Sequence, residues 1–145
     1  HGELAGDDTD GHVDTLARFV APGHIVYQAC TDPEGVNYES LAALRRELEA
    51  LRQVDGSPYQ LDALPWPDQL QCNLATALPT SYANFLILNG HLFLPQYGDP
   101  ADLAAFELLR KVCPQYQIVP VDCQALINQY GGLHCATMNI PDPNP

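Results

Sequence analysis

Apolar residues along the chain predict two successive units with the same order of elements. In the first unit, residues 14–20 and 25–30 are rich in apolar and β-branched side chains and predict two strands. The Ala21-Pro22-Gly23 segment between them is a turn signal, so the two strands are expected to form a hairpin. A third strand is predicted over residues 59–64.

A helix is predicted between the second and third of these strands. Asn37 or Ser40 can cap its start, and Gly56-Ser57-Pro58 follows its expected end near Gln53. Leucines recur through this segment at spacings of three and four residues, which places them on one helical face. That predicted apolar face consists of Leu41, Leu44, Leu48 and Leu51.

The second unit repeats this order of strands. Residues 83–88 and 91–95 predict two strands, and Asn89-Gly90 between them is a strong signal for a hairpin. Another strand is predicted over residues 117–121.

The helix of the second unit is expected to begin at Asp99-Pro100, with Asp99 as the N-cap and Pro100 as the first helical residue, and to end near Cys113. Its predicted apolar face consists of Leu103, Phe106, Leu109 and Val112.

The two units predict an α/β fold built by internal repetition. Their turn glycines, Gly23 and Gly90, are 67 residues apart, and an irregular segment over residues 64–80 separates the units. We expect one domain over residues 1–145, with internal modules at about 12–66 and 80–140. Such units pack beside one another, and their exposed sheet edges predict that further copies belong next to these two.

Charge and composition narrow the classes of partner. Eighteen acidic residues against six basic ones give a net charge of −12, which disfavours nucleic acid and anionic membranes. The same charge favours cationic ligands, although an acidic surface can also serve solubility alone. No apolar stretch approaches the roughly 18 residues of a membrane span, and no signal-peptide pattern is present. The chain opens on His1 rather than Met, which predicts a processed or truncated product.

Five cysteines are present without a Cys-x-x-Cys pair, which argues against a zinc ribbon and favours a reducing, cytoplasmic compartment. Cys30, Cys113 and Cys123 end apolar runs and are expected to behave as small buried hydrophobes.

An acidic, glycine-broken segment over residues 6–14 is the first candidate for chemistry. If His12 and Asp14 lie in a strand, their side chains face the same side and can reach one ligand. A calcium loop fits poorly, because alignment on its glycine places Gly6 and Ala17 at ligand positions. A solvated acidic turn remains open, as does a divalent-metal site with the ligands Asp7, Asp8, Asp10 and His12.

Cys135 is the second candidate, because it follows the flexible pair Gly131-Gly132, where the backbone can approach a ligand closely. A thiolate there needs a nearby cation, either the ligand itself or a protonated imidazole. Adjacent residues of a strand face opposite sides, so His134 is expected to be structural and His12 catalytic.

These segments resemble a known family. GDDTDGHVDTLARF (residues 6–19) resembles the central motif of the agmatine deiminase and bacterial peptidyl-arginine deiminase family, and GLHCATMN (residues 132–139) resembles its C-terminal nucleophile motif. SYANF (residues 81–85) and PQYGDP (residues 95–100) are also similar to the family. The resemblance spans nearly the whole chain and implies a fivefold pseudo-symmetric α/β propeller (pentein), of which this chain holds about two of five modules.

The resemblance also implies roles for single residues. Cys135 matches the nucleophile, His12 the general acid and base, and Asp14 the carboxylate that holds the guanidinium; Asp8 and Gly132 are expected to help bind the substrate. The family's Trp-x-Arg-Asp motif has no match here, because Trp66 lies in Pro65-Trp66-Pro67, so the chain looks like a C-terminal portion that lacks its N-terminal half.

The implied activity is hydrolysis of a guanidine to a ureido product and ammonia through a covalent Cys thiolate intermediate, with no metal or organic cofactor. Agmatine is the preferred substrate, with N-carbamoylputrescine as product and a place in putrescine synthesis; free arginine and peptidyl arginine are alternatives. Met138-Asn139 after Thr137 departs from the usual agmatine-branch sequence and leaves that choice open. The rival interpretation is an inactive fragment without a complete site. The expected partners are a small cationic guanidine substrate, the missing N-terminal half and a second copy in a homo-oligomer.

Overall fold

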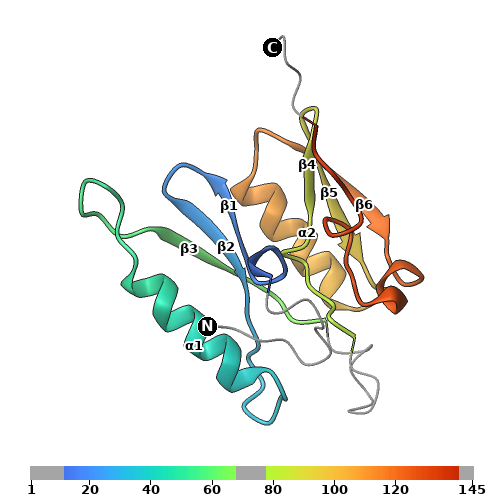
Figure 1. Ribbon diagram of the computed structural model, residues 1–145, viewed down its shortest axis with the longest axis horizontal. Helices are drawn as coiled ribbons and strands as arrows, with labels where there is room; N and C mark the ends of the chain where they lie inside the picture. The colour runs from blue at the N-terminus through green and yellow to red at the C-terminus, as the bar shows by residue number, and fades with distance from the viewer. Residues whose placement is uncertain (1–11, 68–77, 141–145) are drawn as a thin grey trace.

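The computed structural model describes residues 12–67 and 78–140, which form a mixed α/β arrangement (Figure 1). Within these residues, two three-stranded sheets and two α-helices make up the regular structure. The first sheet has the order β1-β2-β3 and the second the order β4-β5-β6. None of the described helices is long and apolar enough to cross a membrane.

The first unit contains a hairpin followed by a helix and a parallel strand. β1 (Ala17–Ala21) and β2 (His24–Gln28) pair antiparallel, and Gly23 turns between them with a φ of 73°. α1 (Tyr38–Ala50) then crosses over, so that β3 (Gln60–Leu64) pairs parallel to β2. Crossovers of this kind need a helix or a similarly long connection, which the leucine-rich segment supplies.

The second unit has the same topology. β4 (Leu86–Leu88) pairs antiparallel with β5 (His91–Gln96). Asn89 and Gly90 join these two strands at φ values of 50° and 77°, the positive pair that a two-residue hairpin turn requires. α2 (Ala101–Val112) leads to β6 (Gln117–Asp122), which pairs parallel to β5.

One backbone hydrogen bond recurs at the same place in both units. Gln60 N donates to Gly23 O at 2.8 Å in the first unit, and Gln117 N donates to Gly90 O at 3.0 Å in the second. The expected order of elements therefore occurs twice, with the same strand directions and the same junction between the hairpin turn and the last strand.

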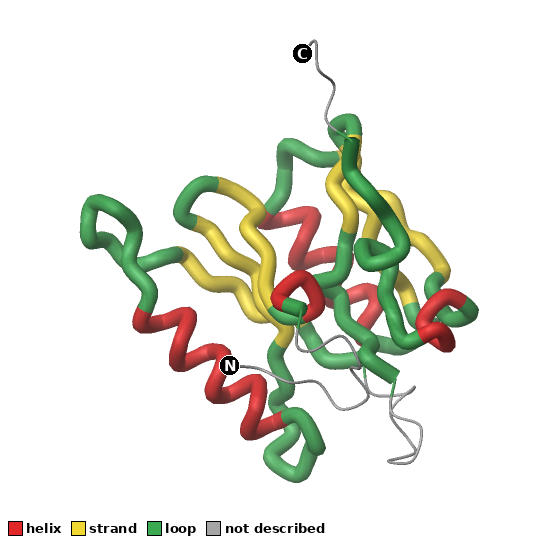
Figure 2. The backbone as a smooth tube through the Cα atoms, viewed as in Figure 1, coloured by secondary structure: helices red, strands yellow, loops and turns green. Residues whose placement is uncertain are grey.

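The first sheet is covered on both faces (Figure 2). Ile25 and Tyr27 pack toward α1, whereas Val26, which points to the opposite face of the same strand, joins the core of the second unit. α2 lies between the two sheets in this view, with Ala105 and Leu109 fully buried. β2 is consequently buried along its whole length, as its apolar run predicted.

The helices differ from expectation at single leucines. α1 ends at Ala50, and the backbone of Leu51 is extended, so this side chain leaves the apolar face and is 46% exposed. Leu103 is 68% exposed, because the buried stripe of α2 follows Ala105 and Leu109, and Leu103 lies on the opposite side of the helix. α2 also begins one residue later than expected, at Ala101, although Asp99 Oδ1 still accepts a hydrogen bond from Ala101 N at 2.8 Å.

Two strands are shorter than their apolar residues predicted. β4 begins at Leu86 rather than at residue 83, because the backbone at 81–84 makes local turn contacts instead of pairing. β1 begins at Ala17, and residues 13–15 form a 3-10 turn, η1 (Val13–Thr15). The expected strand through Asp14 is therefore wrong, and the same-face argument for His12 and Asp14 no longer applies.

Candidate functional site

Asp14 and Cys135 meet although 121 residues separate them in the sequence. Cys135 Sγ lies 3.7 Å from Asp14 Oδ2. Asp14 belongs to η1, directly before β1, and Cys135 follows the short helix η3 (Leu126–Gln129) after β6. Figure 1 shows the blue segment before β1 between the two sheets. Hydrogen bonds of Asp14 with His134 and Cys135 connect this segment to the red C-terminal segment. The site therefore lies where the two units face each other.

The 3-10 turn holds Asp14 through local hydrogen bonds. Thr15 donates twice to the carbonyl of His12, from its backbone nitrogen at 3.2 Å and from Oγ1 at 2.7 Å. Leu16 N donates to Val13 O at 2.9 Å and closes the turn. Because Thr15 and Leu16 are buried, this turn is anchored in the core and fixes the Asp14 backbone.

Cys135 lies in a tight turn rather than in a strand. Ala136 N donates to Gly132 O at 3.3 Å, and Thr137 donates to His134 O from its backbone nitrogen at 3.0 Å and from Oγ1 at 2.7 Å. Neighbouring side chains in a turn need not face opposite sides. His134 and Cys135 both reach Asp14, so the strand argument that separated them is wrong.

His134 pairs directly with Asp14. Its Nδ1 lies 2.7 Å from Asp14 Oδ2, and both side chains are mostly buried. Burial by itself would raise the pKa of Asp14, but the hydrogen bond and charge of His134, the hydrogen bond of Cys135 and the charge of Arg18 together lower it. Asp14 is therefore an anion at neutral pH.

Arg18 adds a positive charge near Asp14 and Cys135. Its Nη1 donates to Phe85 O at 2.8 Å, and its guanidinium carbon lies 4.8 Å from the centre of the Phe85 ring. Burial lowers the pKa of Arg18, whereas the negative charges of Asp14 and Cys135 act in the opposite direction. Arg18 thus connects β1 of the first unit to the second unit while it balances the charge of the site.

A buried amide lies between the two site segments. Asn84 is 1% exposed, and its Nδ2 lies 3.1 Å from Asp14 Oδ2 and 3.3 Å from Cys135 Sγ. Its Oδ1 accepts from the backbone nitrogens of His134 and Cys135, at 2.8 and 3.4 Å. Asn84 therefore contacts every part of the site that the two segments supply.

The other predicted site residues have different surroundings. His12 is exposed, and its imidazole makes no hydrogen bond or ion pair with another residue that the structure describes. Gly132 is buried, and its close neighbour is the Asn84 side chain. Asp8 lies outside the described residues, and so do Asp7 and Asp10 of the alternative metal site. Among the residues that are described, no cluster of His, Cys, Asp and Glu side chains could hold a metal ion.

The remaining described cysteines lack this environment. Cys113 and Cys123 are fully buried in the core of the second unit. Burial raises the pKa of the Cys113 thiol to about 11, and it raises that of Cys123 as well. Cys30 is partly exposed and donates to Asp32 O at 3.6 Å. Cys135 is thus the free and exposed thiol within the described part of the chain that lies beside charged groups.

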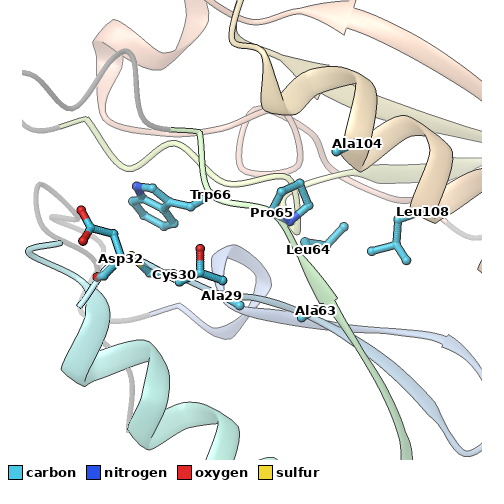
Figure 3. A pocket seen from close by; sticks show the side chains of 10 residues that line it. Ala29, Cys30, Asp32, Ala63, Leu64, Pro65, Trp66, Ala104 and Leu108 are labelled. Atoms are coloured by element: carbon cyan, nitrogen blue, oxygen red, sulfur yellow. Dashed lines mark hydrogen bonds between the residues drawn. The ribbon is translucent and has the colours of Figure 1, made fainter. Parts of the chain in front are cut away.

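The hollow drawn in Figure 3 is a separate feature. It has a volume of about 390 Å³ and lies where the ends of β2 and β3 approach α2. Leu64, Pro65 and Trp66 line it on one side and Ala104 and Leu108 on the other, and its described lining includes neither Asp14 nor Cys135. Its walls are mostly apolar, and Cys30 and Asp32 also line it.

Three contributors to the site were not found from the sequence. The argument that makes His134 structural holds only for strands, although its position next to Cys135 is a signal. Asn84 and Arg18 lie in the segments that resemble the family, but no role was expected for them. An amide or guanidinium gains such a role only through neighbours that are distant in the sequence, which no local pattern reveals.

Comparisons with known proteins identify a family and several related structures. The family described as Porphyromonas-type peptidyl-arginine deiminase matches residues 1–141. An agmatine deiminase of Pseudomonas fluorescens is 32% identical over 97% of this chain and 43% of its own length. A solved Porphyromonas gingivalis structure, provisionally named an arginine deiminase, is 45% identical with a TM-score of 0.92, and covers 97% of this chain and 41% of that one.

A solved agmatine deiminase of C. jejuni, a cysteine-to-serine variant with substrate bound, is 35% identical with a TM-score of 0.83. The match covers 93% of this chain and 38% of that one. The chain therefore spans less than half the length of the relatives it matches.

Proposed function

The chain belongs to the Porphyromonas-type peptidyl-arginine deiminase family, and we propose on that premise that it supplies the nucleophile side of a site that hydrolyses guanidines. The observation that carries this proposal is the 3.7 Å approach of the exposed Cys135 sulfur to the Asp14 carboxylate. A thiol next to an anion is a poor arrangement for an anionic ligand. A guanidinium is a cation, and it can bind the carboxylate while its carbon faces the sulfur.

Asp14 receives the substrate in this proposal. Carboxylates pair with guanidinium groups through charge-assisted hydrogen bonds that also fix orientation. A guanidinium has five N–H donors when it carries one substituent, so one carboxylate satisfies only part of it. We propose that Asp8 and further carboxylates, outside the described residues, complete the grip. The net charge of −12 favours the approach of such a cation.

The chemistry follows from these positions. The Cys135 thiolate attacks the central guanidinium carbon, and a C–S bond forms. His12 donates a proton to one nitrogen, the C–N bond breaks, and ammonia leaves. Water then gives a proton to His12 and adds to the same carbon as hydroxide. The C–S bond breaks and restores the thiolate, and the remaining O–H proton passes to solvent as the neutral ureido product leaves. Proton transfer of this kind contributes about 10²–10⁴-fold to the rate.

The substrate class is supported more strongly than the individual substrate. We propose agmatine, because the curated relatives at 32% identity are named agmatine deiminases. Arginine and peptidyl arginine are the alternatives, and the more similar Porphyromonas gingivalis structure is named for arginine. The same carboxylate and thiolate would serve all three guanidines, so the choice depends on groups that contact the rest of the substrate.

The proposal extends to the architecture. The two described units share their topology and one junction hydrogen bond, which supports their being two of five modules of a propeller. Residues beyond the two described units would then close the ring over the site and supply its other carboxylates. The proposed setting is a cytoplasmic enzyme of putrescine synthesis that forms homo-oligomers.

Ammonia release tests the proposal. The full-length protein should release ammonia from agmatine, and arginine and a peptidyl-arginine substrate should be compared in the same assay. Cys135→Ala should abolish turnover, whereas Cys30→Ala should keep it, because Cys30 lines the separate hollow of Figure 3. A haloacetamidine reagent should form an adduct at Cys135. Substantial turnover by Cys135→Ala would remove the nucleophile assignment.

The two histidines can be separated in the same assay. His12→Asn should lower kcat by about 10²–10⁴-fold if its imidazole transfers the proton. His134→Asn can still donate a hydrogen bond toward Asp14, so we expect a higher KM with a smaller change in kcat. The opposite pattern, in which only His134→Asn loses kcat, would assign proton transfer to His134.

A further inference from the structure

The amide of Asn84 is the buried polar group that both site segments share. Asn84 lies two residues before β4, and its side chain reaches Asp14 on one side and residues 134–135 on the other. Its polar neighbours on Asp14, His134 and Cys135 are 50 to 70 residues away in the sequence. A buried polar group costs free energy unless it is paired, and this one is paired at both ends.

The neighbours fix the orientation of the amide. Oδ1 accepts from two backbone N–H groups, those of His134 and Cys135. Nδ2 faces the Asp14 carboxylate and the Cys135 sulfur. A flipped amide would place its NH₂ against two donors and its oxygen against an anion, so only one orientation satisfies the site.

The N–H groups of the Asn84 amide also offset the repulsion between the Cys135 thiolate and the Asp14 carboxylate. When Cys135 is a thiolate, its sulfur and the Asp14 carboxylate are two anions 3.7 Å apart. Like charges at this distance disfavour each other. The Nδ2 group has two N–H bonds, and its contacts at 3.1 and 3.3 Å allow one for each anion. Because the amide is neutral, it does so without repelling a cationic substrate.

We propose that Asn84 is a positioning residue for the deiminase reaction. Its Oδ1 anchors the backbone of the nucleophile turn, and its Nδ2 holds the Cys135 thiolate and the Asp14 carboxylate at the separation that one guanidinium can bridge. The effect of Asn84 on catalysis rests on the proposed function. The geometry itself, a hydrogen bond from a buried amide to Cys135, can be tested without any turnover.

Gly132 gives independent support for this arrangement. A Cβ at Gly132 would lie 2.3 Å from Asn84 Oδ1 and 2.8 Å from its Cγ. Gly132 is not among the glycines with a positive φ, so space rather than backbone conformation requires glycine here. At Gly131 the nearest atom to such a Cβ is Cys135 Cβ, at an ordinary 3.4 Å. Gly131→Ala is therefore a matched control for Gly132→Ala.

Alkylation of Cys135 by iodoacetamide, followed on its peptide by mass spectrometry across a range of pH, tests the proposal on the full-length protein. Asn84→Ala and Gly132→Ala should both slow alkylation at neutral pH and shift its pH profile upward, because the thiolate loses a hydrogen-bond donor. Gly131→Ala should alkylate like the wild type. Turnover by Asn84→Ala should fall about 10²-fold, the cost of a misplaced reacting group, mainly in kcat.

Double and conservative variants separate positioning from folding. Gly132→Ala should add little to Asn84→Ala, because the closest clashes are with atoms that Asn84→Ala removes. Asn84→Asp keeps the acceptor for the two backbone nitrogens but puts a carboxylate beside the sulfur. It should keep the fold and slow alkylation further, so the test survives if Asn84→Ala does not fold.

Some results would overturn the inference. Wild-type alkylation rates and pH profile in Asn84→Ala or Asn84→Asp would show that the amide does not act on the sulfur. Equal effects of Gly131→Ala and Gly132→Ala would show that the Asn84 contact is not the cause. A wild type that releases no ammonia but shows the expected alkylation pattern would contradict the proposed function and leave the positioning role supported.

Discussion

Asp14 is the residue at which the two ends of the described chain are joined. Its carboxylate contacts His134 Nδ1, Asn84 Nδ2 and Cys135 Sγ through one oxygen, Oδ2. These partners, together with Arg18, favour the charged form more than burial disfavours it, so the pKa of Asp14 lies below its ordinary value of 3.8. The same contacts that keep Asp14 charged therefore also stabilise the fold.

This pKa shift predicts a stability that depends on pH. A carboxyl whose pKa is lower in the folded state stabilises that state above its unfolded pKa, and the contribution is lost as pH falls through the folded value. Asp14→Asn should therefore unfold more easily than the wild type at neutral pH, and the difference should shrink below about pH 3.8. Urea unfolding at a series of pH values measures it.

The control for Asp14→Asn is Glu34→Gln, which changes an exposed carboxyl on a loop. It should leave the free energy of unfolding nearly unchanged at every pH. A difference between Asp14→Asn and the wild type that stays constant, or grows, toward low pH would contradict the assigned shift.

At the scale of elements, α2 is the helix that holds the two sheets together. Ala105 and Leu109 are fully buried and share a core with Val26 of the first sheet and with Leu92 and Leu94 of the second. The small Ala105 side chain lets the helix backbone approach that core closely. The leucine spacing alone gave Leu103 the same role, but it lies on the opposite side of the helix.

Leu109 and Leu103 of α2 are predicted to differ strongly in how much they contribute to stability. Leu109→Ala removes a fully buried side chain and should lower the free energy of unfolding by about 2–5 kcal/mol. Leu103→Ala, on the exposed side of the same helix, should change it by no more than about 0.5 kcal/mol. Chemical denaturation of both variants decides the matter, and equal losses would show that the buried face has been assigned wrongly.

At the scale of the whole molecule, a buried polar joint connects the two units beneath the site. Gln28 at the end of β2 accepts from Tyr82 N at 3.0 Å and donates to Pro65 O, and its Oε1 lies 3.2 Å from Ser81 Oγ. Ser81 Oγ also donates to the carbonyl of Thr15, beside Asp14, at 2.6 Å. The position of Asp14 relative to Asn84 thus depends on this joint.

Removal of the joint should destabilise the protein. Gln28→Leu leaves Tyr82 N and Pro65 O without this partner in the core, at about 1–3 kcal/mol for each buried group. Gln115→Leu is the control, because Gln115 also connects the units, through a bond to Val20 O, but is itself exposed. It should cost about 0.5 kcal/mol or less. A Gln28→Leu protein as stable as the wild type would mean that the units are held by apolar contacts alone.

The elements and their order follow from local patterns in the sequence. Strands, hairpin turns and helices depend on neighbours within a few residues, so Gly23, Asn89-Gly90 and the leucine spacing of α1 were enough to predict both units. The sequence also singles out Asp14 and Cys135, because their motifs are continuous in the chain. Proposed roles for His12 and Asp8 rest on the same motif and stay predictions.

Long-range packing, in contrast, determines which side chains share the site. The strand expected at Asp14 is a 3-10 turn, since Thr15 and Leu16 are anchored in the core, and the turn at Cys135 lets His134 face Asp14. Asn84 and Arg18 acquire their contacts from segments 50 to 70 residues away. Such contacts depend on how two sheets pack around α2, and local hydrophobic patterns carry no information about that packing.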